Sequence, residues 1–575
     1  MLTNRKSAEL CRRAFHILVR IHHLDNTRDK REVGVIVRFP INFISAGFLL
    51  VSAGAVQTTP AAPDVYSGAP ECVHTGSGTD FAVGPNQPYQ NITDVPWEKL
   101  RGGDTVRIFY RKTPYHEKIV ISTNGTAGEP IRICGVPSPD GQRPILDGQQ
   151  GMNRPADAQA YSDYEPMQGL AVILIWNRDY DLKVHNVTIE GIHIRNARSG
   201  FSYVRTDGRK QEYETGAACI RVQAGDNIVI RDNELETCGS GIFTMSQEYN
   251  EASLTRNILI EGNYLHNNGE PGTGRSHGVY IQAIGATYQF NRFGPNNTES
   301  HGVSLKERVA GSVIRYNWFD SGSSRVLDLV EVEDAAAWYI EQAYLDSLDG
   351  EEPDPERLEK VRQAEAAYRN TYVYGNFFRH IGSATDAGNL IHYGYDNDPQ
   401  LARRGVLYFF NNTLMMLNDR EDSWRIRLSD VYLYDESTGT PAQETVEAFN
   451  NIFYLAPETP GQEPSYLCIG RESGLIRLGT NWISDGWQTE LAQSECYPYE
   501  TRPRIEGTEN LRSQPALPAP VDPVTLDPLP ATGTLGSPQK LPEALAAHIP
   551  DLQYVPHLTA RPRGPVAILG ARQFP

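Results

Sequence analysis

Two stretches of the sequence open alike but differ at one position where chemistry could occur. The first reads HGVYIQ from His277 and the second reads HGVSLK from His301, so that Lys306 corresponds to Gln282. A lysine whose pKa is lowered can act as a general base, and a histidine can donate or accept a proton near neutral pH. We therefore take Lys306, both histidines and the nearby Arg325 as candidate catalytic residues.

If the distance from His277 to His301 is the length of one coil, equivalent side chains of successive coils form columns. Val279, Val303 and Leu327 would then form an apolar column that faces the core. Because side chains alternate between the two faces of a strand, the polar neighbours would point outward on one strip. The expected polar columns are His277, His301 and Arg325; Tyr280, Ser304 and Asp328; and Gln282, Lys306 and Val330. The expected ligand-binding residues on this strip are Arg275, Tyr280, Gln282, Arg308, Asp328 and Glu331.

Simpler interpretations stay open for these residues. An outward lysine on a regular surface is usually only solvated, and either histidine could serve to stabilise a turn. Carboxylates follow the same strip at Asp328, Glu331, Glu333 and Asp334, and carboxylate oxygens suit Ca²⁺. Their spacing matches no specific calcium loop, so a charged approach to the next segment is the alternative to a calcium site. No organic cofactor is expected.

An internal repeat dominates the chain. A short run of β-branched or aromatic residues followed by Asn and an apolar residue recurs, as in NIVIRDNEL from 227, NILIEGNYL from 257 and SVIRYNWF from 312. The first asparagines of this pattern recur at an interval within the range of solenoid repeats. The later intervals are longer and irregular, which requires insertions. The aligned asparagines are Asn233, Asn263, Asn291, Asn317, Asn376, Asn412 and Asn451.

The repeat unit predicts an all-β solenoid. Each unit holds two or three short apolar strands without helical periodicity, and a unit this small can bury its apolar face only by stacking on its neighbours. An Asn at a fixed turn tolerates left-handed backbone geometry and can hydrogen-bond to the Asn of the next coil. We therefore predict a right-handed parallel β-helix.

The flanking segments differ in composition from the repeats. Residues 1–55 resemble an export signal, because an apolar stretch ends in the small-x-small pattern Ala53-Gly54-Ala55, and a membrane anchor is the alternative. The charged front end suggests a true start nearer Val33 or Val35. The remaining segments are a lead-in at 56–94, the β-helix domain at 95–511 with a helical insertion at 333–369, and a Pro-rich C-terminal tail at 512–575.

Charge and cysteine content narrow the class of protein. A net charge of −18 argues against nucleic-acid binding, which needs a basic surface. After signal cleavage near Ala55, an even set of six cysteines remains, which suits an oxidising periplasmic or extracellular compartment. Cys219 with Cys238 and Cys468 with Cys496 are the near pairs, and free thiols are the alternative. The mature protein is expected to be monomeric and not inserted in a membrane.

The segment SLKERVAGSVIRYNWFDSGSSRVLDLVE, which contains Lys306, is similar to the matching segment of β-helix polysaccharide lyases of the alginate lyase and chondroitinase B family. The wider pattern, from GDTVRI through HGVYIQ to VLDLVE, resembles exported bacterial β-helix proteins that degrade polysaccharides. The resemblance implies Lys306 as the Brønsted base. It supplies no partner, because the family's catalytic Arg falls in the column that Val330 occupies here, so Arg325, His301 or His277 would have to act as the acid.

This resemblance implies β-elimination on an acidic, uronate-containing polysaccharide. The reaction needs a neutral base, a cation at the carboxylate and a proton donor. Arg308 and Arg325 would lower the pKa of Lys306 and, with Arg275 and Arg292, attract the polyanion. Two alternatives stay open: a glycoside hydrolase that uses Asp328 with Glu331 or Asp334, and a non-catalytic glycan-binding protein that uses Tyr280, Tyr288 and Trp318.

Overall fold

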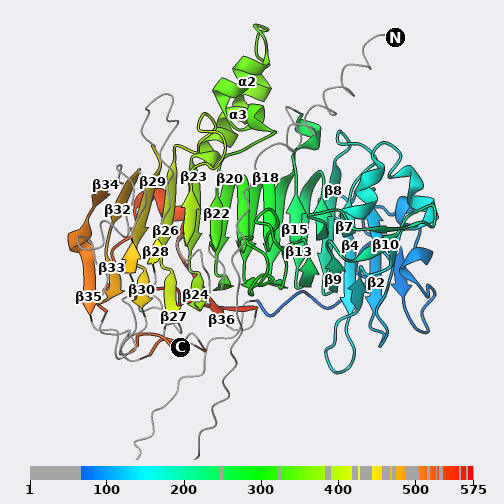
Figure 1. Cartoon of the computed structure of the whole chain (residues 1–575), viewed down its shortest axis with the longest axis horizontal. Coiled ribbons are helices and arrows are strands. Elements are labelled where there is room, and N and C mark those ends of the chain that lie inside the picture. The colour runs from blue at the N-terminus through cyan, green and yellow to red at the C-terminus, as the bar shows by residue number, and fades with distance from the viewer. Residues whose placement is uncertain are drawn as a thin grey trace, which may run out of the picture. The chain divides into compact units, whose positions relative to one another are not determined.

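The computed structural model shows the parallel β-helix that the repeats predicted (Figure 1). It describes residues 66–573, apart from 247–249, 322–324, 382–389, 418–424, 428–442, 456–465, 469–473, 486–503, 515–518, 523, 526, 530–534, 556–557 and 565–566. The predicted signal at 1–55 and Cys496 lie outside the described residues. All described elements belong to one compact unit, Thr59–Pro575.

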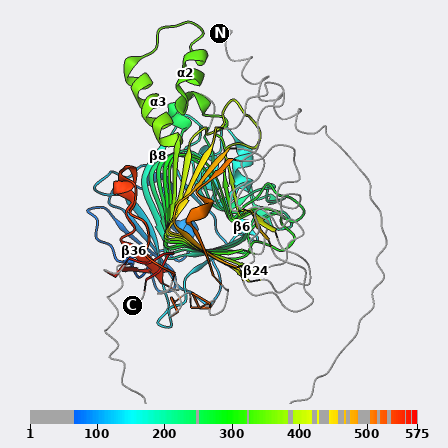
Figure 2. The same ribbon diagram turned by 90° about the vertical axis from the view of Figure 1, so that its left-hand side faces the viewer.

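The strands stack into three parallel faces, which Figure 2 shows nearly end-on. The first face contains β3 (Ile119–Ile121), β7 (Ala171–Ile175), β12 (Ala218–Val222), β15 (Ser240–Thr244), β18 (Val279–Gln289), β20 (Leu305–Arg315), β22 (Leu327–Leu329) and β25 (Ile391–Tyr393). The long strands β18 and β20 continue into the second face. They therefore join the first two faces into one sheet of 19 strands.

The second face completes this sheet. Its strands, besides the second halves of β18 and β20, are β1 (Asp80–Val83), β2 (Thr105–Phe109), β4 (Ile131–Val136), β8 (Val184–Glu190), β13 (Gly225–Arg231), β16 (Arg256–Glu261), β23 (Asn370–Tyr374), β26 (Val406–Phe410), β29 (Thr445–Phe449), β32 (Leu475–Leu478) and β34 (Arg504–Glu506).

The third face is a separate sheet of 11 strands. It contains β5 (Ile145–Asp147), β9 (His193–Ala197), β14 (Glu234–Cys238), β17 (Tyr264–His266), β19 (Arg292–Phe293), β21 (Trp318–Ser321), β24 (Phe377–Ile381), β27 (Thr413–Leu417), β30 (Ile452–Leu455), β33 (Asn481–Ser484) and β35 (Leu511–Gln514). Buried Ile, Val and Leu side chains from all three faces fill the interior as one continuous core.

The remaining short strands form small separate sheets. A small sheet is formed by β6 (Gly151–Met152), β10 (Ser202–Val204) and β11 (Lys210–Glu212), and two strand pairs are formed by β28 (Arg425–Arg427) with β31 (Tyr466–Cys468) and by β36 (Leu552–Val555) with β37 (Thr559–Pro562). No helix in the described part of the chain is long and apolar enough to cross a membrane.

A buried asparagine ladder runs along the corner between the second and third faces. Each ladder Asn donates its backbone N–H and its side-chain amide to the side-chain oxygen of the next Asn, at 2.9–3.2 Å. All seven predicted asparagines take part, and Asn481 is an eighth that the repeat search missed. The left-handed backbone geometry falls on the residue before the ladder Asn, as at Phe290 and Tyr316, and not on the Asn itself.

The segment between β22 and β23 is helical. It holds α2 (Glu341–Ser347) and α3 (Pro355–Tyr368), with Pro355 as the first residue of α3. Asp354 caps α3 by accepting hydrogen bonds from the backbone N–H groups of Glu356 and Arg357. Buried Tyr339, Tyr344 and Tyr368 pack the helices onto the first two faces.

The C-terminal residues pack along the solenoid instead of leaving it. Tyr554 contacts Trp318 edge-on, Asp551 accepts a hydrogen bond from Tyr316, and the ring of His548 stacks on Tyr372 at 3.7 Å between centroids. These contacts cover an aromatic cluster beside the ladder. Trp318 and Tyr288 are buried, so neither is the exposed glycan-stacking ring that a binding protein would need.

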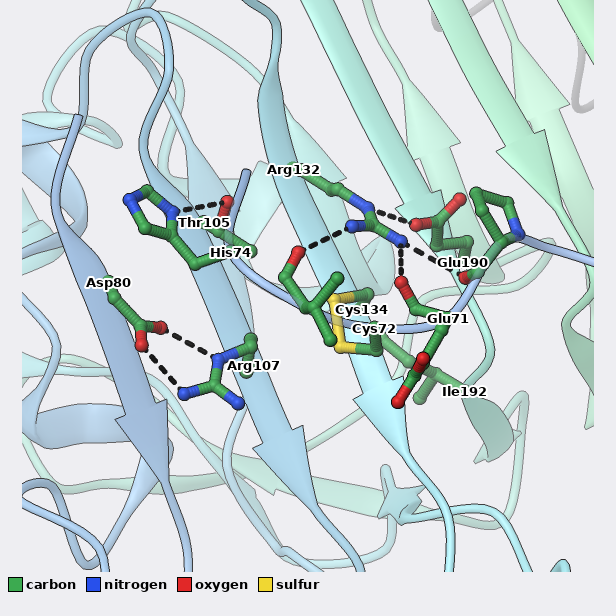
Figure 3. The surroundings of a disulfide bond; sticks show 12 residues. Glu71, Cys72, His74, Asp80, Thr105, Arg107, Arg132, Cys134, Glu190 and Ile192 are labelled. Carbon is green, nitrogen blue, oxygen red and sulfur yellow. Dashed lines mark hydrogen bonds and ion pairs between the residues drawn. A yellow bond between two sulfur atoms is a disulfide. The ribbon is translucent and has the colours of Figure 1, made fainter. Parts of the chain in front are cut away.

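Two disulfides tie consecutive parts of the β-helix together. Cys219–Cys238 is the predicted pair and joins β12 to β14. Cys72–Cys134 links the lead-in to β4, beside Arg132, whose guanidinium donates to Glu190 and to the backbone oxygens of Glu71 and Val73 (Figure 3). Disulfides of this kind persist in oxidising compartments, which fits a periplasmic or extracellular protein.

The ladder predicts a large cost for losing one asparagine. In Asn291→Ala, the backbone N–H and side-chain amide of Asn263 lose their acceptor, and the carbonyl of Ile260 and the side-chain oxygen of Asn317 lose a donor. Leaving buried polar groups unpaired should destabilise the protein by about 3 kcal/mol or more. Urea denaturation measures this change. Asn124→Ala, which removes one exposed acceptor, is the matched control and should shift the midpoint little.

Candidate active site

The strand register places Lys306 in a different column from the expected one. Lys306 on β20 lies opposite Tyr280 on β18, opposite Asp328 on β22 and, one coil further, in line with His392 on β25. Gln282 lies opposite Arg308. The predicted columns are therefore wrong at the middle coil: Tyr280 and Asp328 do share a column, but Lys306 lies between them in place of Ser304. The coil from β18 to β20 is longer than the distance between the two HGV motifs, and the coil from β20 to β22 is shorter.

The shared HGV motif caused this error. His277-Gly-Val runs into β18 at Val279, whereas Val303 precedes β20, which begins at Leu305. Leu305, not Val303, pairs with Val279 in the core. The spacing of 26 residues between the ladder asparagines Asn291 and Asn317 equals the offset between paired residues of β18 and β20, and so indicated the correct register.

Lys306 is a buried cation between two carboxylates. Its ammonium nitrogen lies 2.6 Å from Asp328 and 2.6 Å from Asp396, and only about a tenth of the side chain is exposed. Burial by itself lowers the pKa of Lys306, but the two carboxylates outweigh it, so the pKa is raised. The expectation of a lowered pKa considered the arginines near Lys306 but not the effect of Asp328, and it did not include Asp396; in this arrangement Lys306 is charged.

Tyr280, Lys306, Asp328 and His392 form one column of side chains across successive coils, and Asp328 lies near its centre. Besides Lys306, its carboxylate contacts Nδ1 of His392 at 2.6 Å and the guanidinium of Arg325 at 3.4 Å. Burial alone would raise the pKa of Asp328, yet Lys306 and His392 hold it well below its usual range. Nε2 of His392 lies 3.0 Å from the backbone oxygen of Tyr395. Asp328 is therefore an ionised carboxylate with fixed partners.

Arg308 forms the second cation of the site. Its Nε donates to the hydroxyl of Tyr280 at 3.0 Å, which also accepts from Gln282 at 3.1 Å. The remaining guanidinium nitrogens contact Glu331 at 3.1 Å, Glu333 at 2.7 Å and Asp396 at 3.0 Å. Arg308 is almost fully buried, and these carboxylates replace the water molecules that would solvate its guanidinium at the surface.

Glu331 positions the loop that carries Asp396. Its carboxylate accepts hydrogen bonds from the backbone N–H groups of Asp396, Asn397 and Asp398 at 2.8–2.9 Å, and its side chain is inaccessible to solvent. Sequence reasoning missed Asp396 and His392. The signal was present in LIHYGYDND from Leu390, which repeats the alternation of VLDLVEVED from Val326 one coil later.

The two candidate histidines have different surroundings. His277 is buried, its Nδ1 accepts a hydrogen bond from the backbone N–H of Val303 at 3.1 Å, and its ring meets Tyr280 edge-on. Burial, with a smaller effect of Lys306, lowers the pKa of His277 to about 3, so the ring is neutral and carries its proton on Nε2. His301 and Arg275 lie exposed outside the strands and do not join the column.

The residues expected to bind calcium do not converge. Asp328 is paired with Lys306, Glu331 with backbone N–H groups, and Glu333 with Arg308, while Asp334 lines a neighbouring cavity of about 850 Å³ below the helices. Among the described residues, no group of three or more His, Cys, Asp or Glu side chains is arranged to hold a metal ion. A calcium requirement stays a prediction.

Arg292, expected to help attract a polyanion, lies on the third face. Its guanidinium pairs with Asp320 at 3.2 Å and contacts Tyr264 and Trp318. The cations that do meet at the site are Lys306, Arg308 and Arg325.

No family model and no curated protein matches the chain. Among solved structures, similarity is found to pectate lyase Pel9A, with 10% identity and a TM-score of 0.30 over 86% of this chain and 96% of that one. A rhamnogalacturonan lyase shows 11% identity and a TM-score of 0.28 over 76% and 87%, and a GH136 lacto-N-biosidase from Eubacterium ramulus shows 10% and 0.29 over 76% and 68%. Similarity this low carries no argument, so the proposal below depends on the geometry of the site.

The neutral state of His277 predicts a dependence of stability on pH. The unfolded state takes up a proton near pH 6.5, whereas the folded state does so only near pH 3. The stabilisation is therefore complete above pH 6.5 and falls as the pH drops toward 3, by up to about 3 kcal/mol at pH 4. His277→Asn keeps an acceptor for Val303 and does not titrate, so denaturation curves should show a weaker loss between pH 7 and 4. Equal losses in both proteins would contradict this assignment.

Proposed function

We propose that the protein is an exported enzyme that cleaves an acidic, uronate-containing polysaccharide by β-elimination at the site around Lys306. The observation that carries the proposal is that two cations of one strand, Lys306 and Arg308, are directed at a single carboxylate position, at 2.6 and 3.0 Å. Asp396 fills that position here. Positive charge at the carboxylate of a uronate stabilises the anion that forms when the neighbouring proton is removed.

In β-elimination, the proton on the carbon next to the carboxylate is removed, the bond to the 4-linked sugar oxygen breaks, and a double bond forms between the two carbons. Negative charge builds up on the carboxylate as the proton leaves. Lys306 and Arg308 would stabilise that charge in a site largely closed to water. Tyr280, which is neutral because burial raises its pKa, can donate a proton to the leaving sugar oxygen, and the proton taken from the carbon passes to water.

Lys306 is assigned an electrostatic role in this proposal, in place of the base that the family resemblance implied. A base must begin the reaction without its proton, and two carboxylates at 2.6 Å oppose the loss of a proton from Lys306. A permanent charge at this position serves the carboxylate instead. The two roles differ in how they tolerate arginine, which is always charged.

A glycoside hydrolase is the second candidate, supported by one observation. Asp328 and Asp396 each lie 2.6 Å from the nitrogen of Lys306, so their nearest oxygens are at most 5.2 Å apart, which is 2.6 plus 2.6. Retaining glycosidases hold their carboxyl groups about 5–5.5 Å apart. The pair differs from the expected Asp328 and Glu331, because Glu331 is buried on backbone N–H groups. Against hydrolysis, the pKa values of both Asp328 and Asp396 are lowered, so neither is a proton donor.

The decisive experiment is incubation of the mature protein with a panel of uronate polymers, with and without calcium, while the ultraviolet absorbance of the unsaturated product is followed. Lys306→Ala should lower kcat/KM by about 10³-fold or more, since it leaves Asp328 and Asp396 without their shared cation. Lys306→Arg should retain at least a tenth of the wild-type value if the role is electrostatic.

Three outcomes separate the alternatives. An arginine variant as inactive as the alanine variant would restore Lys306 as the base. Shortened polymers without a new double bond would favour the hydrolase, and Asp328→Asn and Asp396→Asn would then be the variants to test. Glycans that bind but are not cleaved would favour the non-catalytic glycan-binding protein.

Export is a separate prediction. The mature protein should begin near Val56 and be recovered outside the cytoplasm, because the small-x-small pattern at Ala53–Ala55 precedes it. Amino-terminal sequencing of periplasmic or secreted material measures the cleavage point. Recovery of a chain that starts at Met1 from the cytoplasm would contradict the prediction.

A further inference from the structure

Asp396 differs from the other carboxylates of the site in origin and accessibility. Asp328 belongs to strand β22 and is 4% exposed, whereas Asp396 lies in the loop after β25 and its side chain is 20% exposed. Its two oxygens are divided between Lys306 and Arg308. Asp396 therefore fills the solvent side of a two-cation site.

Each cation keeps another carboxylate if Asp396 leaves. Lys306 would retain Asp328 at 2.6 Å, and Arg308 would retain Glu331 at 3.1 Å and Glu333 at 2.7 Å. Removing Asp396 therefore leaves no unpaired buried charge, which is the usual cause of large losses of stability. Asp328 has no such freedom, because it is also the partner of His392 and Arg325.

The backbone beneath Asp396 is fixed independently of its side chain. Glu331 accepts the N–H groups of residues 396, 397 and 398, so the loop stays in place through contacts that do not involve the Asp396 carboxylate. A side-chain rotation toward solvent can then vacate the cation pair without movement of the loop.

We propose that Asp396 is an internal substitute for the substrate, and that a free uronate carboxylate displaces its side chain from Lys306 and Arg308. This inference rests on the proposed function of the site and adds the substrate class: uronates with free carboxylates, not their methyl esters. An ester carries no charge and cannot compete with Asp396 for two cations. Asp396 thus competes with a free carboxylate for the two cations and has little effect on the binding of a neutral ester.

The test measures binding without turnover. Saturated trisaccharides of galacturonate, mannuronate and guluronate, each as the free acid and as the methyl ester, are titrated against wild type, Asp396→Ala and the near-isosteric Asp396→Asn. Both variants should bind at least one free acid about tenfold or more tightly than wild type, with little change for the ester. Asp398→Asn is the matched control in the same loop, because its side chain contacts the N–H of Gln400 and neither cation, and it should bind as wild type does.

The results distinguish this inference from the proposed reaction. Tighter binding of free acids without any unsaturated product would support the role of Asp396 and contradict the proposed β-elimination. Variants that still fold, as judged by their melting temperature, but bind free acids no better than wild type would overturn the inference, even if elimination is observed. Absence of binding by wild type and both variants would overturn it as well.

Discussion

The asparagine ladder is the constraint on which the other features of the β-helix depend. Because each Asn donates its backbone N–H and its side-chain amide to the side-chain oxygen of the next Asn, the same corner of each coil is fixed. Extra residues must then leave the coil elsewhere. Asn317 and Asn376 are separated by 59 positions in sequence, and the extra chain leaves the coil after β22, where it forms α2 and α3. The insertion can therefore grow beside the site without disturbing the register beneath it.

The charged column is expensive to bury, and its composition shows how the cost is offset. Lys306, Arg308, Asp328 and Glu331 are each at least nine-tenths buried, and every one of them has opposite charges or hydrogen-bond partners within about 3 Å. A buried ion pair adds little net stability compared with apolar residues of the same volume. Such a cluster fits a site that must hold charge in a fixed position better than a site that only stabilises the fold.

The described residues of the lead-in and the tail contact other parts of the β-helix than this column. Tyr66 stacks on Phe290, and the tail contacts Tyr316, Tyr372 and Trp318, all beside or beyond the second face. The column lies on the first half of β18 and β20, on the other side of the bend where these strands enter the second face. These chain segments thus cover the aromatic cluster, whereas at the charged column the side chain of Asp396 keeps 20% of its surface exposed.

The sequence by itself determined the solenoid, the ladder and one disulfide, because these depend on repeated local patterns: apolar alternation, an Asn at a fixed turn, and two nearby cysteines. It also identified most of the residues that meet at the site, including Lys306, Arg308 and Asp328. Only the tertiary structure decided how they meet. Coils of unequal length, which the spacing of the HGV motifs did not reveal, moved Lys306 opposite Tyr280 and Asp328. The loop after β25, 90 residues away in sequence, brought Asp396 to Lys306 and set its charge state; the repeated alternation from Leu390 marks the strand before this loop but does not specify the contact.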